Sequence, residues 1–255
     1  MSSSIWTQCG AKPNVARHRG VAWRAVEDQH RISTRKLVDS DEEHELLEDL
    51  IDETKPSLPE GLPQTLDYLL FTPFRYPPLQ RGSRFGTRSE HGIWYGSEQI
   101  RTVFAEVGYY RLLFLDGTAA APELTPLYLK FTVFNVDLKS DRAVDLTKAP
   151  FRAHHALISS KTDYVGSQRL GTAMRDHGVE VFRYVSARDT DAGVNIGLFS
   201  PSAFASKKPK QRQAWLGVAS LDAVEFSRKD GEKGGPYHLL RTQYEVDGRL
   251  PAPAF

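Results

Sequence analysis

The sequence lacks most features that mark secreted or membrane proteins. It contains one cysteine, Cys9, which cannot form an internal disulfide, and it has no Asn-x-Ser/Thr glycosylation site. No segment approaches the roughly 18 apolar residues of a membrane-spanning helix, and the first residues lack the apolar core of a signal peptide. These absences predict a cytoplasmic protein with no membrane partner.

The chain also lacks an excess of charge of either sign. Its 33 basic residues nearly balance its 32 acidic residues, and the net charge is +1. A basic excess is the usual mark of proteins that bind nucleic-acid phosphates. The small basic segment 207–212 has no interleaved aromatic residues, so we interpret it as a solvated loop. We therefore expect no direct nucleic-acid partner.

Common catalytic and metal-binding motifs are missing as well. The sequence has no GxSxG, HExxH, CxxC or GxxxxGK[ST] motif. His154 and His155 are adjacent, so their side chains point in different directions, and no carboxylate cluster accompanies them. We expect no metal site and no prosthetic group.

The order of the predicted elements favours an α+β fold. A chain of 255 residues is long enough for one large domain with its own core. Residues 1–20 are polar and unpatterned, which predicts a flexible leader before a single domain over 21–255. Helical and strand patterns then alternate irregularly, without βαβ units, so we expect a compact mixed β core with flanking helices.

The first strong helical pattern begins at Ser40. Residues 40–43 read Ser-Asp-Glu-Glu, which is a capping box. Apolar residues follow on one face of the predicted helix: Leu46, Leu47, Leu50 and Ile51. The pattern predicts one helix here, and a second, short helix that ends before Pro73.

Another helix is predicted just after Ser97, which can serve as its N-cap. Its apolar residues have the spacing of a core-facing stripe: Ile100, Val103, Phe104 and Val107. At 100° per residue, Glu106 lies about 110° from the centre of this stripe. Glu106 is therefore expected at the edge of the buried face.

The rest of the chain contains several strand patterns. Residues 127–138 alternate between apolar and polar, and residues 139–141 offer a turn into a partner strand over 142–147. A helix stopping at Gly178 follows. Two more strands, at 179–186 and 194–200, are separated by a hairpin-like connection.

Several short motifs occur in a fixed order along the chain. GSRFG contains Arg84, GIWYG contains Tyr95 and TVFAE contains Glu106, each 11 residues after the last. FRYVSARD then contains Ser186, and GVNIGLF contains Asn195. With these motifs the sequence resembles the RES-domain family, bacterial toxins named for an arginine, a glutamate and a serine.

The resemblance runs from about residue 21 to about residue 205 and is closest to the longer, ParT-like subgroup. Relative to the compact members of the family, it implies a helical insertion at about residues 40–70. It implies a fold similar to diphtheria-toxin-type ADP-ribosyltransferases, with NAD⁺ as substrate and inorganic phosphate as one candidate co-substrate. It also implies that Arg84, Tyr95, Glu106 and Ser186 belong to the site. Either Arg24 or Arg31 corresponds to the arginine of the first strand, and we leave both open.

The chemistry of NAD⁺ cleavage fits these residue types. Glu106 can stabilise the positive charge that develops on the ribose when the nicotinamide bond breaks. Arg84, with Arg24 or Arg31, can bind the pyrophosphate. The ring of Tyr95 can stack on nicotinamide. Ser186 can donate a hydrogen bond to a phosphate or ribose oxygen.

Three functional hypotheses follow from the resemblance. The first is a toxin of a type II toxin–antitoxin system that hydrolyses or phosphorolyses NAD⁺ and is blocked at its active site by an Xre/ParS-like antitoxin. The second is a mono-ADP-ribosyltransferase that modifies a specific target protein. The third is an inactive binding module of a toxin–antitoxin complex. The nature of the acceptor, whether water, phosphate or protein, is not decided by the sequence.

Overall fold

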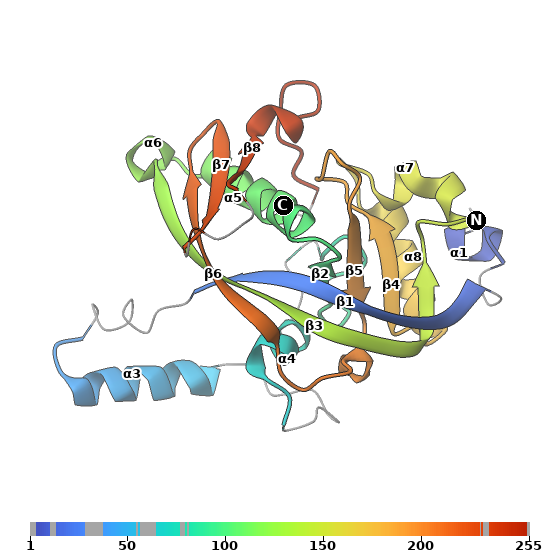
Figure 1. The fold of residues 1–255 in the computed structure, drawn as a ribbon, viewed down its shortest axis with the longest axis horizontal. Helices are drawn as coiled ribbons and strands as arrows, with labels where there is room; N and C mark the ends of the chain where they lie inside the picture. Colours follow the sequence, from blue (N-terminus) through green and yellow to red (C-terminus); the bar gives the residue numbers. More distant parts are fainter. Residues whose placement is uncertain are drawn as a thin grey trace.

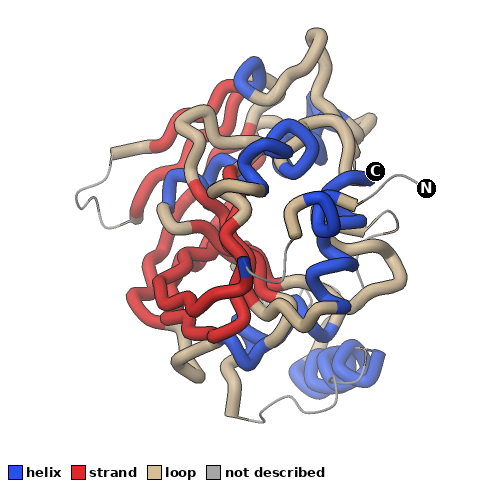
Figure 2. The backbone as a smooth tube through the Cα atoms, turned by 90° about the vertical axis from the view of Figure 1, so that its right-hand side faces the viewer, coloured by secondary structure: helices blue, strands red, loops and turns tan. Residues whose placement is uncertain are grey.

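The computed structural model describes residues 4–10, 14–28, 38–54, 56, 65–76, 80, 82–229, 231 and 235–253. Within these residues the chain forms an eight-stranded mixed sheet with flanking helices (Figure 1), which confirms the predicted α+β class. The strands gather on one side of the molecule (Figure 2). Their order is β1–β2–β5–β4–β3–β6–β7–β8.

The bounds of the elements are as follows. The strands are β1 (Val15–Glu27), β2 (Trp94–Ser97), β3 (Leu127–Asp145), β4 (Val181–Val185), β5 (Val194–Leu198), β6 (Lys210–Ala219), β7 (Ala223–Arg228) and β8 (Tyr237–Leu240). The α-helices are α1 (Ile5–Gln8), α3 (Asp41–Thr54), α4 (Tyr68–Arg75), α5 (Ile100–Asp116), α6 (Ala121–Leu124), α7 (His155–Ile158) and α8 (Val165–Asp176). Short 3₁₀ turns cover Phe151–His154, Pro201–Ala203 and Arg241–Gln243.

None of the described helices combines the length and the apolar character needed to cross a membrane.

The long strand β3 organises the sheet because it pairs with three other strands. It runs antiparallel to β6 and to β1, and its last residues run parallel to β4. β1 also pairs with β2 through Trp23 and Ser97. The pairings β1–β2, β2–β5, β5–β4, β4–β3 and β3–β1 therefore close a ring. This ring places β1, β2 and β5 next to one another.

The turn predicted at residues 139–141 is wrong. β3 continues through these residues, because β1 pairs with it on both sides of them, from Ala16 opposite Ala143 to Arg19 opposite Lys139. A register shift in β1 absorbs the irregularity. The two predicted strands are thus one strand.

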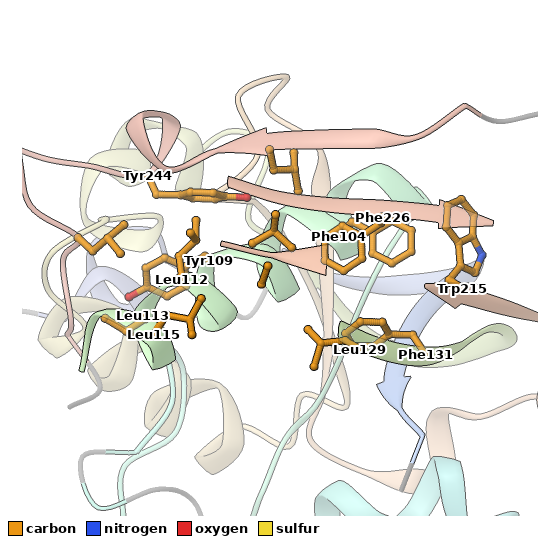
Figure 3. Packing of buried hydrophobic residues seen from close by; sticks show 14 of the residues in the cluster. Phe104, Tyr109, Leu112, Leu113, Leu115, Leu129, Phe131, Trp215, Phe226 and Tyr244 are labelled. Atoms are coloured by element: carbon orange, nitrogen blue, oxygen red, sulfur yellow. The ribbon is translucent and has the colours of Figure 1, made fainter. Parts of the chain in front are cut away.

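The helix α5 lies against the sheet and supplies much of one core cluster. Its Phe104 packs among aromatic side chains of β3, β6 and β7, whereas Tyr109 and Leu112 lie at the other end of the same cluster, where Tyr109 contacts Tyr244 (Figure 3). Phe104 stacks on Phe226 with ring centroids 4.2 Å apart. Each large apolar side chain buried in this way contributes about 1.5–3 kcal/mol. The backbone of α5 is therefore held firmly beside β1, β2 and β5.

The predicted N-cap of α5 is wrong, although the predicted helix is confirmed. The N-cap residue is Gln99, whose side chain makes no capping hydrogen bond. The Ser97 hydroxyl instead donates to Asn195 Oδ1 at 2.6 Å. The Ser97 side chain thus forms its hydrogen bond with a residue 98 positions away in the sequence and does not cap the helix that follows it.

The described part of residues 1–20 belongs to the folded domain, in contrast to the expected flexible leader. The helix α1 packs on α8, and Ile5 and Trp6 are buried. The strand β1 begins at Val15. Two buried side chains are too few to produce a periodic apolar pattern, so this packing leaves no signal in the sequence.

The helix α3 forms as predicted, but two leucines on its apolar face are largely exposed. Glu43 N donates to Ser40 Oγ at 3.1 Å, and Ser40 N donates to the Glu43 carboxylate at 3.3 Å, which completes the capping box. Leu46 and Leu50 are 59% and 50% exposed. In Figure 1, α3 stands apart from the sheet, and it makes no extensive contact with another described element.

The short helix α4 continues beyond Pro73, where the sequence predicted its end. Pro73 lies inside the helix, which ends only at Arg75. Proline removes one backbone donor and disfavours a helical conformation at the residue before it. Here the helix extends just two residues past the proline, with Leu70 and Phe74 buried in the core.

Candidate functional site

Four of the predicted site residues line one cavity of about 250 Å³: Arg24, Arg84, Tyr95 and Glu106. Arg24 comes from β1, Tyr95 from β2 and Glu106 from α5, while Arg84 lies in the loop before β2. The ring of strands brings β1 and β2 together, and α5 closes the cavity from the other side. The tertiary fold thus collects residues that are spread over 83 positions of the sequence.

Glu106 is held by two side-chain hydrogen bonds to the same oxygen. Its Oε1 accepts from Ser186 Oγ at 2.6 Å and from Asn195 Nδ2 at 2.5 Å. The two donors come from different segments, the loop after β4 and the strand β5. Among the described residues both donors bind Oε1, which leaves Oε2 available to a ligand in the cavity.

Ser186 lies beside Glu106 and outside the lining of the cavity. Its side chain is buried, and its hydroxyl oxygen accepts from the backbone N–H groups of Arg188 and Asp189, both at 3.0 Å. These two bonds direct the hydroxyl proton toward Glu106. Direct donation from Ser186 to a substrate oxygen stays a prediction.

Arg24 contributes a cation with unused hydrogen-bonding capacity. Its Nη1 donates to the backbone oxygen of Tyr95 at 2.5 Å, and its guanidinium lies 5.4 Å from the centre of the Trp94 ring. Its Nε is buried and has no partner among the described residues. Burial lowers the pKa of Arg24 to about 10, so the group stays protonated at neutral pH.

Arg84 is a second buried cation. Its Nη1 donates to the backbone oxygen of Ser160 at 2.7 Å, and its guanidinium lies 4.6 Å from the centre of the Tyr164 ring. Burial by itself lowers the pKa of Arg84, but Tyr164, Tyr184 and Glu106 outweigh burial and leave the pKa raised.

The charges in the cavity do not balance. Glu106 is the one carboxylate among the described lining residues, whereas Arg24 and Arg84 supply two cations. Buried charges are costly without partners. A cavity with a surplus of guanidinium groups therefore suits an anionic ligand, and planar guanidinium groups bind phosphate oxygens well.

Tyr95 connects β2 to the loop that carries Arg84. Its hydroxyl accepts from the backbone N–H of Phe85 at 3.2 Å and shares a hydrogen bond with Ser83 Oγ at 3.0 Å. Burial raises the pKa of Tyr95 to about 12, so the phenol is neutral at physiological pH. Tyr95 thus holds the Arg84 loop in place, and the predicted stacking on nicotinamide stays a prediction.

Of the two candidates for the first-strand arginine, Arg24 lies in the cavity. Arg31 lies outside the residues that the structure describes. The role predicted for Arg31 therefore stays untested.

Three further tyrosines in the cavity were not identified from the sequence: Tyr110, Tyr164 and Tyr184. Tyr110 lies four residues after Glu106 on α5, and residues at i and i+4 share a helix face. That spacing could have identified it. Tyr164 and Tyr184 carry no local signal, because only the tertiary fold brings them to the cavity.

Comparison with known proteins identifies the class that this fold and site define. The RES domain family model matches residues 58–217, so the chain belongs to the RES domain family. The match includes Arg84, Tyr95, Glu106 and Ser186, whereas Arg24 on β1 precedes it.

Two further comparisons add little to this assignment. No protein among curated sequences matches the chain. The chain is similar, with a TM-score of 0.48 and 12% identity, to a chain of the M. tuberculosis MbcT–MbcA toxin–antitoxin complex, over 86% of this chain and 94% of that one.

Proposed function

We propose that this protein is a bacterial toxin that cleaves the nicotinamide–ribose bond of NAD⁺. The observation that carries the proposal is the arrangement around Glu106. Its carboxylate is fixed by Ser186 and Asn195 at the edge of a cavity that also holds Arg24 and Arg84. A positioned carboxylate beside buried cations matches a substrate with a ribosyl centre next to a pyrophosphate.

Glu106 stabilises the transition state of this reaction. The bond between the ribose C1 and the nicotinamide nitrogen breaks, and its electron pair leaves with nicotinamide, which becomes neutral. Positive charge then develops on the ribose C1 and its ring oxygen. A carboxylate already held in place stabilises that charge without having to reorganise, an effect that typically contributes about 10²–10³-fold in rate.

The two arginines bind the pyrophosphate of the substrate. Arg24 and Arg84 each contribute a buried guanidinium to the lining of the cavity. Their charge compensates the two negative charges of the pyrophosphate. Binding there fixes the ribose relative to Glu106, and the cavity tyrosines offer aromatic faces to the nicotinamide ring.

An oxygen nucleophile completes the reaction at the ribose C1 and loses its proton. Water gives ADP-ribose, and inorganic phosphate gives a phosphorylated ADP-ribose. We favour these small acceptors, and transfer to a protein side chain is the alternative outcome of the test below. Membership of the RES domain family and the resemblance to ParT-like toxins support a cognate antitoxin that covers the cavity.

Incubation of the purified protein with NAD⁺, followed by chromatography of free nicotinamide, tests the proposal. We expect nicotinamide release, and parallel reactions with and without inorganic phosphate identify the acceptor from the second product. Labelled NAD⁺ in a cell extract detects transfer to protein. The absence of nicotinamide release under all three conditions would contradict the proposal.

A further inference from the structure

The hydrogen bonds around Glu106 extend one residue farther, to Ser97. Ser97 Oγ donates to Asn195 Oδ1 at 2.6 Å, and Asn195 Nδ2 donates to Glu106 Oε1 at 2.5 Å. Ser97 is the last residue of β2 and faces Asn195 directly in the β2–β5 ladder. Both side chains are buried, each with 2% of its surface exposed. A buried chain of hydrogen bonds thus leads from β2 through β5 to the carboxylate.

The chemistry of the amide group gives Ser97 a specific task. The amide of Asn195 has nearly the same shape after a 180° rotation, which exchanges its oxygen and its nitrogen. Glu106, as a carboxylate, accepts hydrogen bonds only. In the rotated orientation two acceptor oxygens would face each other in a buried site, and the nitrogen would point at Ser97. Glu106 therefore selects the orientation that presents the nitrogen to it, and the Ser97 hydroxyl, by donating to Oδ1, satisfies the buried amide oxygen and anchors the amide in that position.

We propose that Ser97 is a positioning residue that anchors the Asn195 amide and, through it, holds the Glu106 carboxylate in place. The proposal rests on the proposed function for its kinetic consequence. The Glu106 side chain reaches the site through three rotatable bonds, and the two donors on Oε1 select one arrangement of them. Loss of the Ser97 hydroxyl leaves the buried amide oxygen without its donor, so the Asn195 side chain is held less firmly and one of these two constraints weakens.

Substitution of Ser97 by alanine tests this role against a matched control. Ser140 is likewise buried, and its hydroxyl donates to the Glu180 carboxylate at 2.6 Å, away from the cavity. We expect Ser97→Ala to lower kcat for nicotinamide release by about tenfold with little change in KM, because misplacement of a catalytic group costs rate. Ser140→Ala should retain the wild-type kcat. Equal kcat values for the two variants would overturn the proposal.

A double-mutant cycle separates positioning from general structural damage. In a chain that already carries Asn195→Ala, Ser97 has no amide to anchor. We therefore expect Ser97→Ala to have little further effect on kcat in that background. Full additivity of the two substitutions would show that Ser97 acts independently of Asn195, and it would overturn the proposal.

A measurement that needs no enzymatic activity keeps the two proposals apart. In ¹⁵N-labelled protein, Asn195→Ala identifies the side-chain amide signals of Asn195. We expect Ser97→Ala to shift these signals and to speed their exchange with water, and Ser140→Ala to leave them unchanged. Unchanged signals in Ser97→Ala would overturn the positioning role. Shifted signals in a protein that releases no nicotinamide would instead refute the proposed function alone.

Discussion

The helices α3 and α5 carry similar apolar patterns in the sequence but have opposite surroundings in the fold. In α5, Leu112 is fully buried and Phe104 stacks on Phe226. In α3, Leu46 and Leu50 are at least half exposed. Periodic apolar residues therefore predicted both helices, but they did not predict which helix packs extensively against other described elements.

The difference follows from what each helix lies next to. The strands that precede and follow α5 belong to the sheet, so the sheet covers the apolar side of this helix. α3 has a complete capping box but no extensive contact with another described element. Local signals are sufficient to form a helix end, whereas burial needs surfaces from distant parts of the chain. A carboxylate on α5, such as Glu106, thus has a firmly packed support that the described surroundings of α3 do not offer.

The two helices should differ most in how much stability the protein loses when a leucine in each is replaced by alanine. Leu112→Ala in α5 removes a fully buried side chain and leaves a cavity in the core. We expect the free energy of unfolding to fall by about 2–5 kcal/mol. Urea denaturation monitored by circular dichroism measures this loss. A loss below about 1 kcal/mol would contradict the burial of this face of α5.

Leu50→Ala is the matched substitution in α3, and its effect should be the smallest. Leu50 is 50% exposed, and alanine has a slightly higher helix propensity than leucine. We expect the free energy of unfolding to stay within about 0.5 kcal/mol of the wild-type value in the same denaturation experiment. A loss similar to that of Leu112→Ala would contradict the exposure of Leu50.

The features that were correctly predicted depend on neighbouring residues. The capping box at residues 40–43 and the position of Glu106 at the edge of an apolar stripe both follow from helix geometry alone. The α+β class follows from the irregular order of the elements. Local patterns of this kind are present in the sequence before any tertiary contact forms.

The features that were missed depend on contacts between distant residues. The hydroxyl of Ser97 has Asn195 as its partner, and β3 continues because β1 pairs along it. The motifs indicated that Ser186 belongs to the site, but its bond to Glu106 across 80 residues required the structure. A single sequence contains no direct record of such pairs.

Replacing one glutamate by glutamine in each helix tests most directly whether the carboxylate on α5 takes part in NAD⁺ cleavage. Glu106→Gln and Glu45→Gln make the same change, the first in the cavity and the second on the exposed surface of α3. We expect nicotinamide release from NAD⁺ to fall at least about 100-fold in Glu106→Gln and to stay at the wild-type rate in Glu45→Gln. Nicotinamide release by Glu106→Gln at the wild-type rate would contradict the central role of this carboxylate.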